Sequence, residues 1–238
     1  MTETPSPLTA LFSSLACAEI EENLKSLANG KNAIKMRAYM RDQFEFLGIA
    51  TPLRRQATNR LIRCNACTTP ERIMAIAGQL WDLPSREFQY VAIDLLASRH
   101  RDLDLPHVDA MVQLVQQKSW WDTVDGLSLV VGKVLKRLLA NDDCVHECMD
   151  WAVVHDNLWV RRVAMIHQLG WREKTDTARL KQYASKLAAD PDFFIRKAIG
   201  WAFRDYAKHN AIWVRDTVTV LSDRLSPLSI REAMKHLQ

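Results

Sequence analysis

The chain has 238 residues, of which 48% are hydrophobic and 25% are charged, and it contains only 7 Gly and 8 Pro. This length is enough to bury a sizeable core, and the composition, rich in Leu, Ala, Arg and Lys, favours helices over sheets. The formal net charge is +4, and no apolar run reaches the about 20 residues of a membrane span, which argues against a membrane protein.

The N-terminal stretch MTETPSPLTALFSSL has no basic region before its short apolar segment, so it does not match a secretory signal peptide. The five cysteines fit a reducing compartment, where thiols stay free. We therefore expect a cytoplasmic protein.

Helical segments follow one another along the chain. Residues 69–83 begin with a Thr cap and a Pro, and residues 85–100 begin with a Ser cap before apolar residues at helical spacing. Residues 176–190 and 192–210 behave alike, each starting with Asp. About a dozen such segments, without a clear strand pattern, predict an all-α fold in a single domain over residues 1–238.

Two groups of cysteines could suggest a zinc site. Cys64 and Cys67 form one pair, and Cys144, His146 and Cys148 form the other group. A shared structural site normally brings its pairs within about 20 residues in sequence, whereas these groups lie much farther apart. On a helix, His146 would also point away from both neighbouring cysteines. We therefore expect ordinary thiols and no metal.

A repeat runs through the chain. Six segments align at their starts, and each has an apolar second residue that we expect to anchor its helix in a shared core. These anchors are Leu53, Phe88, Val124, Val160, Ile195 and Ile230. Their successive spacings are 35, 36, 36, 35 and 35 residues, a period typical of helix pairs stacked into a solenoid. The fold class that we predict is an all-α solenoid of about six HEAT-like helix pairs with a concave basic groove.

The two positions after each anchor should lie near the edge of one surface. The first position is occupied by Arg54, Gln89, Asp125, Arg161, Arg196 and Arg231. The second is occupied by Arg55, Tyr90, Gly126, Arg162, Lys197 and Glu232. Four arginines at the first position form a basic ladder that could follow a phosphate backbone. Alternatively, these arginines bind an Asp of a neighbouring helix or the carbonyls at its C-terminus.

The C-terminal third is basic: residues 155–238 contain 15 Lys and Arg against 9 Asp and Glu, a balance of +6. Residues 1–154 contain 17 against 19, a balance of −2. An uneven distribution of this kind suits an anionic partner such as nucleic acid, although a solvated surface of mixed charge gives the same count.

Asp125 interrupts the ladder with a carboxylate, which would repel phosphate and should therefore have another task. It belongs to the stretch KSWWDTVDG, residues 118–126. Trp120 lies four residues before the anchor Val124 and should face the core, whereas Trp121 lies four residues before Asp125 and should share its side of the helix. Asp122 should cap the helix or face solvent. Trp121 and Asp125 are therefore the candidate site.

A second exposed aromatic is expected near the same surface, because Lys197 and Trp201 are also four residues apart and share a helix face.

The stretches KSWWDTVDG, DNLWVRRVAM, FFIRKAIGWAFRDYAK and PLSIREAMKHL closely resemble the AlkD-like DNA alkylation repair glycosylases, from about Ile34 to the C-terminus. The resemblance implies HEAT-like repeats around a concave DNA-binding face. It also implies removal of cationic alkylpurines, chiefly 7-methylguanine and 3-methyladenine, from double-stranded DNA.

The resemblance assigns the catalytic carboxylate to Asp125, the active-site tryptophans to Trp121 and Trp201, and the phosphate-binding arginine to Arg162. It implies contacts to the deoxyribose and backbone instead of a flipped base in a tight pocket. We expect a monofunctional glycosylase without cofactor, acting as a monomer in the bacterial-type cytoplasm and associated with the nucleoid through DNA. Further expected DNA contacts are Tyr39, Thr51, Arg54, Arg55, Lys118 and Lys197.

Two alternatives remain open on the residues alone. One is a non-catalytic helical-repeat scaffold with a protein-binding surface, which does not explain why Asp125 interrupts the ladder beside Trp121. The other is a DNA-binding relative that recognises branched or bent DNA without breaking bonds.

Overall fold

The computed structural model describes residues 7–63, 69–139 and 143–237. Within these ranges the chain forms thirteen α-helices and three short 3-10 helices, with no strand, which confirms the predicted all-α class. The contacts divide the chain into two compact units, residues 1–103 and 104–238. The single domain and the concave groove stay predictions.

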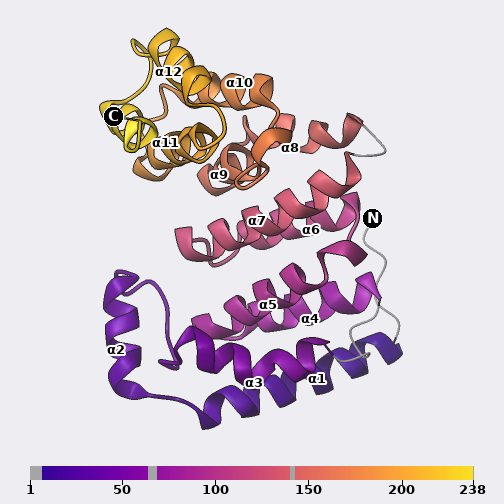
Figure 1. Ribbon diagram of the computed structural model, residues 1–238. Helices are drawn as coiled ribbons and strands as arrows, with labels where there is room; N and C mark the ends of the chain where they lie inside the picture. Colours follow the sequence, from indigo (N-terminus) through magenta and orange to yellow (C-terminus); the bar gives the residue numbers. More distant parts are fainter. Residues whose placement is uncertain (1–6, 64–68, 140–142, 238) are drawn as a thin grey trace. The chain divides into compact units, whose positions relative to one another are not determined.

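Unit 1 contains α1 to α5 and the 3-10 helix η2. Its elements are α1 (Pro7–Ser26), α2 (Gly30–Tyr39), α3 (Thr51–Arg63), α4 (Pro70–Asp82), α5 (Arg86–Ser98) and η2 (His100–Asp102). Helix α1 packs against α3 and α4, and α5 packs against both α3 and α4, as Figure 1 shows. Helix α2 buries none of its residues and stands away from the other helices of this unit (Figure 1).

Unit 2 contains α6 to α13. Its elements are α6 (Leu105–Val115), α7 (Trp121–Leu138), η3 (Asp143–His146), α8 (Glu147–Ala152), α9 (Leu158–Ile166), η4 (Arg172–Lys174), α10 (Thr177–Leu187), α11 (Phe193–Ala207), α12 (Ala211–Val220) and α13 (Pro227–Met234). Helices α7, α9, α11 and α13 pack in series, each against the next. These helices carry four of the six predicted anchors, and α3 and α5 of unit 1 carry the other two.

The predicted burial of the anchors is confirmed in the four middle repeats. Phe88, Val124, Val160 and Ile195 are all buried. The prediction is wrong for Leu53, which is 41% exposed, because α3 instead buries Arg54, Thr58 and Ile62 at four-residue spacing. In the last repeat α13 buries Ser229 and Ala233, and the predicted anchor Ile230 is only partly buried.

Helix starts follow the predicted capping in most cases. The side chain of Thr69 accepts a hydrogen bond from the amide of Arg72, while Asp176 and Asp192 cap α10 and α11 in the same way. Ser85 occupies the cap position of α5, but its side chain makes no capping bond.

Two close helix contacts in unit 2 depend on glycine. A β-carbon at Gly132 of α7 would lie 1.8 Å from the carbonyl oxygen of His167, which follows α9. A β-carbon at Gly200 of α11 would lie 2.8 Å from the carbonyl oxygen of Ser229 in α13. Both separations are too short for any side chain, so these glycines set how closely α7, α11 and their partners approach.

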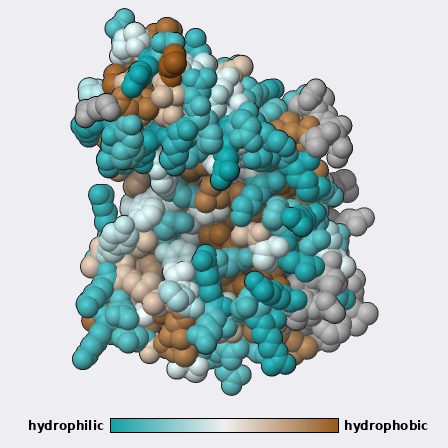
Figure 2. All heavy atoms as spheres, viewed as in Figure 1, coloured by the Kyte–Doolittle hydropathy of each residue, from teal (hydrophilic) through white to brown (hydrophobic). Residues whose placement is uncertain are grey.

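Hydrophilic side chains predominate on the face seen in Figure 2. No helix of the described chain is long and apolar enough to cross a membrane. Among residues 7–63, 69–139 and 143–237, no group of three or more His, Cys, Asp or Glu could hold a metal ion. Cys64 and Cys67 lie outside the described residues, as does the side chain of Cys144. Cys148 is a free thiol whose pKa burial raises to about 11.

Candidate active site

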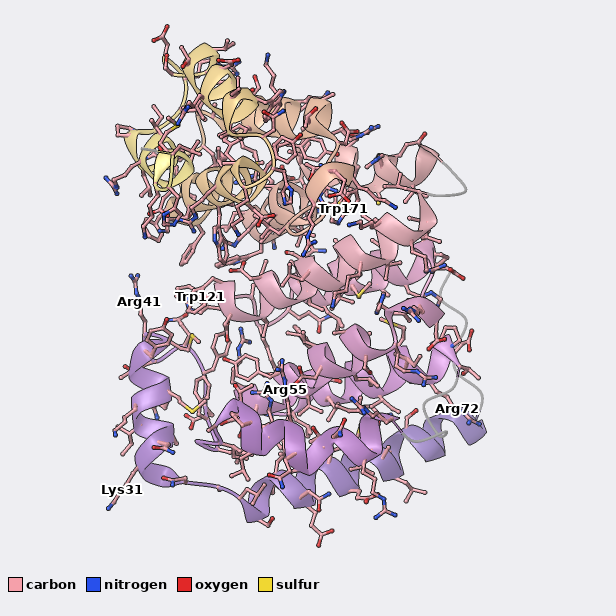
Figure 3. The ribbon with its side chains drawn as sticks, viewed as in Figure 1. Lys31, Arg41, Arg55, Arg72, Trp121 and Trp171 are labelled. Atoms are coloured by element: carbon pink, nitrogen blue, oxygen red, sulfur yellow. The ribbon has the colours of Figure 1, made fainter. Side chains whose placement is uncertain are left out.

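The turn before α7 sets the position of both tryptophans. Lys118 has a left-handed backbone with φ of 48°, and the hydroxyl of Ser119 donates a 2.6 Å hydrogen bond to the carbonyl of Val115 at the end of α6. Trp120 is extended, with φ of −160° and ψ of 160°, and stands at the cap position of α7. Helix α7 therefore begins at Trp121, which projects from its first turn (Figure 3).

Trp120 packs in an aromatic cluster, which we define as Trp120, Trp159 and Phe194. The centroid of the Trp120 ring lies 5.8 Å from that of Trp159 and 5.2 Å from that of Phe194. Trp159 and Phe194 are themselves 4.9 Å apart. Trp120 is thus a packing residue at the starts of α7, α9 and α11, although it is partly exposed and not fully buried.

Asp125 and Arg162 form a two-pronged ion pair between α7 and α9. The Nε of Arg162 donates to Oδ1 of Asp125 at 2.7 Å, and its Nη2 donates to Oδ2 at 2.9 Å. Asp125 belongs to the first ladder position and Arg162 to the second position of the next repeat. The pair therefore connects one repeat to the next through a carboxylate and a guanidinium of matching planar geometry.

Arg162 is held from two further directions. Its Nη1 donates to the carbonyl oxygen of Phe194, in the first turn of α11, at 2.5 Å. Its guanidinium carbon lies 6.0 Å from the centroid of the Trp201 ring, within reach of a cation–π contact. Trp201 is 37% exposed, so one face of the group Asp125, Arg162 and Trp201 is open to solvent.

The environment of Asp125 perturbs its titration. Burial raises the pKa of Asp125 above its ordinary value, and the nearby carboxylate of Asp122 adds to that rise, while the hydrogen bonds and charge of Arg162 lower it. Because burial outweighs the single guanidinium, an additional positive charge would be favourable beside this carboxylate. A carboxylate of this kind is a candidate for stabilising a cationic ligand or transition state.

Arg162 itself differs from the expected surface residue. It is only 3% exposed, and each of its three nitrogens donates to Asp125 or Phe194. The alternative that an arginine of the ladder is bound between neighbouring repeats therefore describes this residue in the structure. Its contact with a DNA phosphate stays a prediction, which would require the side chain to gain exposure.

In three repeats the residue at the first ladder position donates to backbone carbonyls of the preceding segment. The amide of Gln89 donates to the carbonyls of Leu80, Trp81 and Leu83 at the end of α4. Arg161 donates to the carbonyls of His155 and Asp156 after α8, and Arg196 donates to the carbonyl of Asp190 after α10. Gln89 thereby satisfies carbonyls at the end of α4, whereas the two arginines bond carbonyls of the turns that follow α8 and α10.

This capping role explains why Asp125 is exceptional. An ionised carboxylate cannot donate to carbonyls, and in its repeat Ser119 donates to the end of α6 instead. The position is thereby freed for a carboxylate.

The expected surface ladder is wrong at Arg54. This residue is buried and donates to Asp94 of α5 at 3.2 Å, and its guanidinium stacks 4.9 Å from the centroid of the Tyr90 ring. As for Arg162, contact with DNA would require this guanidinium to gain exposure, so the DNA contact of Arg54 stays a prediction. The neighbouring Arg55 also binds Asp94, at 2.9 Å, but its side chain remains 64% exposed.

The other expected DNA contacts lie in both units. In unit 1, Tyr39 at the end of α2 and Thr51 at the start of α3 are exposed. In unit 2, Lys118 is exposed at the turn before α7, and Lys197 of α11 pairs with Glu232 of α13 at 2.9 Å. The structure thus brings together Asp125, Arg162 and Trp201, places Trp121 one turn from Asp125, and leaves the role of the remaining residues as a prediction.

Sequence reasoning missed the partners Asp94, Asp190 and Glu232. Asp94 lies 39 residues from Arg55, and Asp125 lies 37 residues from Arg162, so both separations are close to the repeat period. Opposite charges separated by about one period could therefore have identified Asp94 and, through Lys197, Glu232. The signal does not reach Asp190, which lies 29 residues from Arg161.

Comparisons with known proteins agree with this architecture. The sequence model of a family described as "DNA alkylation repair enzyme" matches residues 20–237. A solved structure described as "Predicted DNA alkylation repair enzyme from Enterococcus faecalis" is 36% identical, with a TM-score of 0.82, over 88% of this chain and 96% of that chain. Among curated proteins, none matches the sequence.

Proposed function

Since the chain belongs to the DNA alkylation repair enzyme family, we propose that it is a monofunctional DNA glycosylase. Its substrates in this proposal are purines that carry a positive charge after alkylation at N7 or N3, such as 7-methylguanine and 3-methyladenine. The observation that carries the proposal is the partly buried carboxylate of Asp125, held by Arg162 beside the exposed ring of Trp201.

The chemistry of these lesions suits such a site. An alkylated purine leaves as a neutral molecule, so its departure requires little protonation. Positive charge then develops on the deoxyribose, and a water molecule must add to it. A preorganised carboxylate stabilises this charge and orients the water, as in other reactions with oxocarbenium character.

Each residue has a distinct role in the proposal. Asp125 provides the negative charge, through the oxygen lone pairs that its two hydrogen bonds from Arg162 do not occupy. The faces of Trp121 and Trp201 contact the cationic sugar and base, where each favourable contact contributes roughly 1–2 kcal/mol. Arg162 fixes the orientation of the carboxylate and keeps it ionised.

Double-stranded DNA is the partner in this proposal, bound by a monomer in the cytoplasm without a cofactor. Arg55, Thr51, Tyr39, Lys118 and Lys197 are the proposed backbone contacts. Selectivity comes largely from the instability of the lesion's own glycosidic bond, so bulky N7 or N3 adducts are accepted and neutral lesions are poor substrates. No lysine nucleophile takes part, and the strand is not cut.

The test is release of free base from methylated duplex DNA, measured by chromatography under single-turnover conditions. The proposal expects free 7-methylguanine above the spontaneous level and a strand that breaks only after alkali treatment. If no base is released although the protein binds the DNA, the protein is a non-catalytic binder. Strand cleavage without alkali would contradict the monofunctional mechanism.

A further inference from the structure

A network of hydrogen bonds ties the end of α10 to α9. Asp190, in the turn between α10 and α11, accepts from Nε of Arg161 at 3.2 Å and from its Nη2 at 2.9 Å. The Nη1 of the same arginine donates to the carbonyls of His155 and Asp156 at 2.9 and 2.7 Å. Arg161 is therefore fixed on both sides, and it holds Asp190 in one place relative to α9.

The same aspartate shapes the start of α11. The other carboxylate oxygen of Asp190, Oδ1, accepts from the amide of Asp192 at 2.9 Å. Asp192 in turn caps the helix, because its Oδ1 accepts from the amides of Phe194 and Ile195 at 2.7 and 3.4 Å. Arg196 closes the turn by donating to the carbonyl of Asp190 at 3.0 Å. Asp190 therefore fixes the position of the first turn of α11 through Asp192 and Arg196.

This first turn reaches the candidate active site through Phe194. Its carbonyl oxygen accepts from Nη1 of Arg162, whose other two nitrogens hold Asp125. A guanidinium is planar and rigid, so a shift of the Phe194 carbonyl turns the plane of Arg162 and with it the carboxylate. Two adjacent arginines of α9 therefore bind the start of α11. Arg161 does so through Asp190, and Arg162 through the carbonyl of Phe194.

We propose that Asp190 is a positioning residue for base release: through Arg161 and the first turn of α11, it fixes Arg162 and thereby the orientation of Asp125. This inference rests on the proposed glycosylase function. None of the hydrogen bonds that the structure gives for Asp190 reaches Asp125, so it acts through these intermediates.

The matched comparison is Asp150 in the same unit. Asp150 also accepts from an arginine of another helix, Arg179 at 3.1 Å, and from the hydroxyl of Tyr183 at 2.7 Å. None of the hydrogen bonds that the structure gives for Asp150 leads to Arg162 or Asp125. Loss of this carboxylate weakens an arginine pair of unit 2 without disturbing the network around Asp125.

The experiment compares Asp190→Asn with Asp150→Asn in single-turnover release of 7-methylguanine across a range of pH, beside binding to undamaged DNA. Asp190→Asn should slow release by at least about tenfold, within the roughly 100-fold that a misplacement of 1 Å can cause. Its loss of rate at acidic pH should begin at a higher pH than in the wild type, since Arg162 no longer holds the Asp125 carboxylate as firmly. Binding to undamaged DNA should be unchanged.

Asp150→Asn should retain both the rate and the pH profile of the wild type, even if it melts earlier. The inference is overturned if Asp190→Asn shows the rate and profile of the wild type, or if Asp150→Asn suffers the same loss. Should Asp190→Asn fail to fold, Arg161→Gln removes the same ion pair while leaving the bond between Asp190 and the amide of Asp192. A wild-type protein that releases no base overturns the proposed function instead, and this inference with it.

Discussion

Two carboxylates, Asp94 of unit 1 and Asp125 of unit 2, have side chains with the same exposed fraction, 16%, but different cationic surroundings. Asp94 is shared by two arginines, Arg54 and Arg55. Within the described part of the chain, Asp125 is paired with one cation, Arg162, and burial keeps its pKa raised despite that partner. The two carboxylates are equally exposed but differ in the number of cations beside them. Asp94, with two arginines, ties α3 to α5, whereas Asp125, with one, favours a further positive charge.

The comparison also explains the use of arginine in the repeat. Arg54, Arg161 and Arg162 all lie at ladder positions, and all three bind an aspartate of another repeat or of the turn that follows. Such pairs hold the stack together, whereas Arg55 retains an exposed guanidinium beside its tie to Asp94.

The largest expected effect on stability comes from breaking the pair in unit 2. Arg162→Ala should lower the free energy of unfolding by about 3–5 kcal/mol, because it leaves the carboxylate of Asp125 buried without its partner. Arg55→Ala, at an exposed pair, should change it by about 0–1 kcal/mol. Chemical denaturation measures the free energy of unfolding of both variants. A loss below about 1 kcal/mol for Arg162→Ala would show that the pair of Asp125 and Arg162 does not hold α7 to α9.

The two adjacent tryptophans provide the second test. Trp120→Ala should lower the free energy of unfolding by about 3 kcal/mol, since it removes one ring of the aromatic cluster. Trp121→Ala should cost less stability and slow base release far more. Thermal melts and excision rates decide between them, and a greater loss of stability in Trp121→Ala would reverse the assigned roles.

The raised pKa of Asp125 predicts the pH dependence of base release. Only the ionised carboxylate stabilises the sugar cation, so the rate should fall as the pH drops through the pKa of Asp125, at a pH above the usual range of an aspartate. Two charged groups act on the pKa of Asp125: Arg162 lowers it and Asp122 raises it. The residual activity of Asp125→Asn, after subtraction of spontaneous release, should lack this acidic decline; a decline of the same shape in that variant would assign it to another group.

The smallest effect concerns the exposed cation of unit 1. Arg55→Ala should weaken binding to undamaged DNA and reduce the slope of log affinity against log salt by about one unit. Arg54→Ala is the control, because its buried guanidinium should affect the melting temperature and leave the slope unchanged. Equal slopes for Arg55→Ala and the wild type would remove Arg55 from the proposed contacts.

Much of the fold can be predicted from the sequence, because one short pattern at the helix starts recurs every 35 or 36 residues and is therefore recognisable. The starts of α5, α7, α9 and α11 and their buried anchors follow from it. The first repeat does not, since an ion pair with Asp94 and stacking on Tyr90 draw Arg54 inward and leave Leu53 exposed. These contacts come from another helix, about one repeat away, and no local pattern contains them.

The candidate site was predictable in part for the same reason. The four-residue spacing of Trp121 and Asp125 is local, and the aspartate stands out against arginines at equivalent positions. The extended backbone of Trp120 and the burial of Arg162 depend on the packing of three helix starts against one another. Resemblance supplied the residues of the site, but the carbonyl of Phe194 that completes it belongs to the backbone, which no residue identity reveals.

The comparison between the two carboxylates is tested most directly by single-turnover release of 7-methylguanine from methylated duplex DNA with Asp125→Asn and Asp94→Asn. We expect Asp125→Asn to lose about 10²–10³-fold in rate, the effect of removing one preorganised charge-stabilising group, while still binding DNA. Asp94→Asn should melt earlier and release base at nearly the wild-type rate. A near wild-type rate for Asp125→Asn, or an equal loss in both variants, would contradict the account.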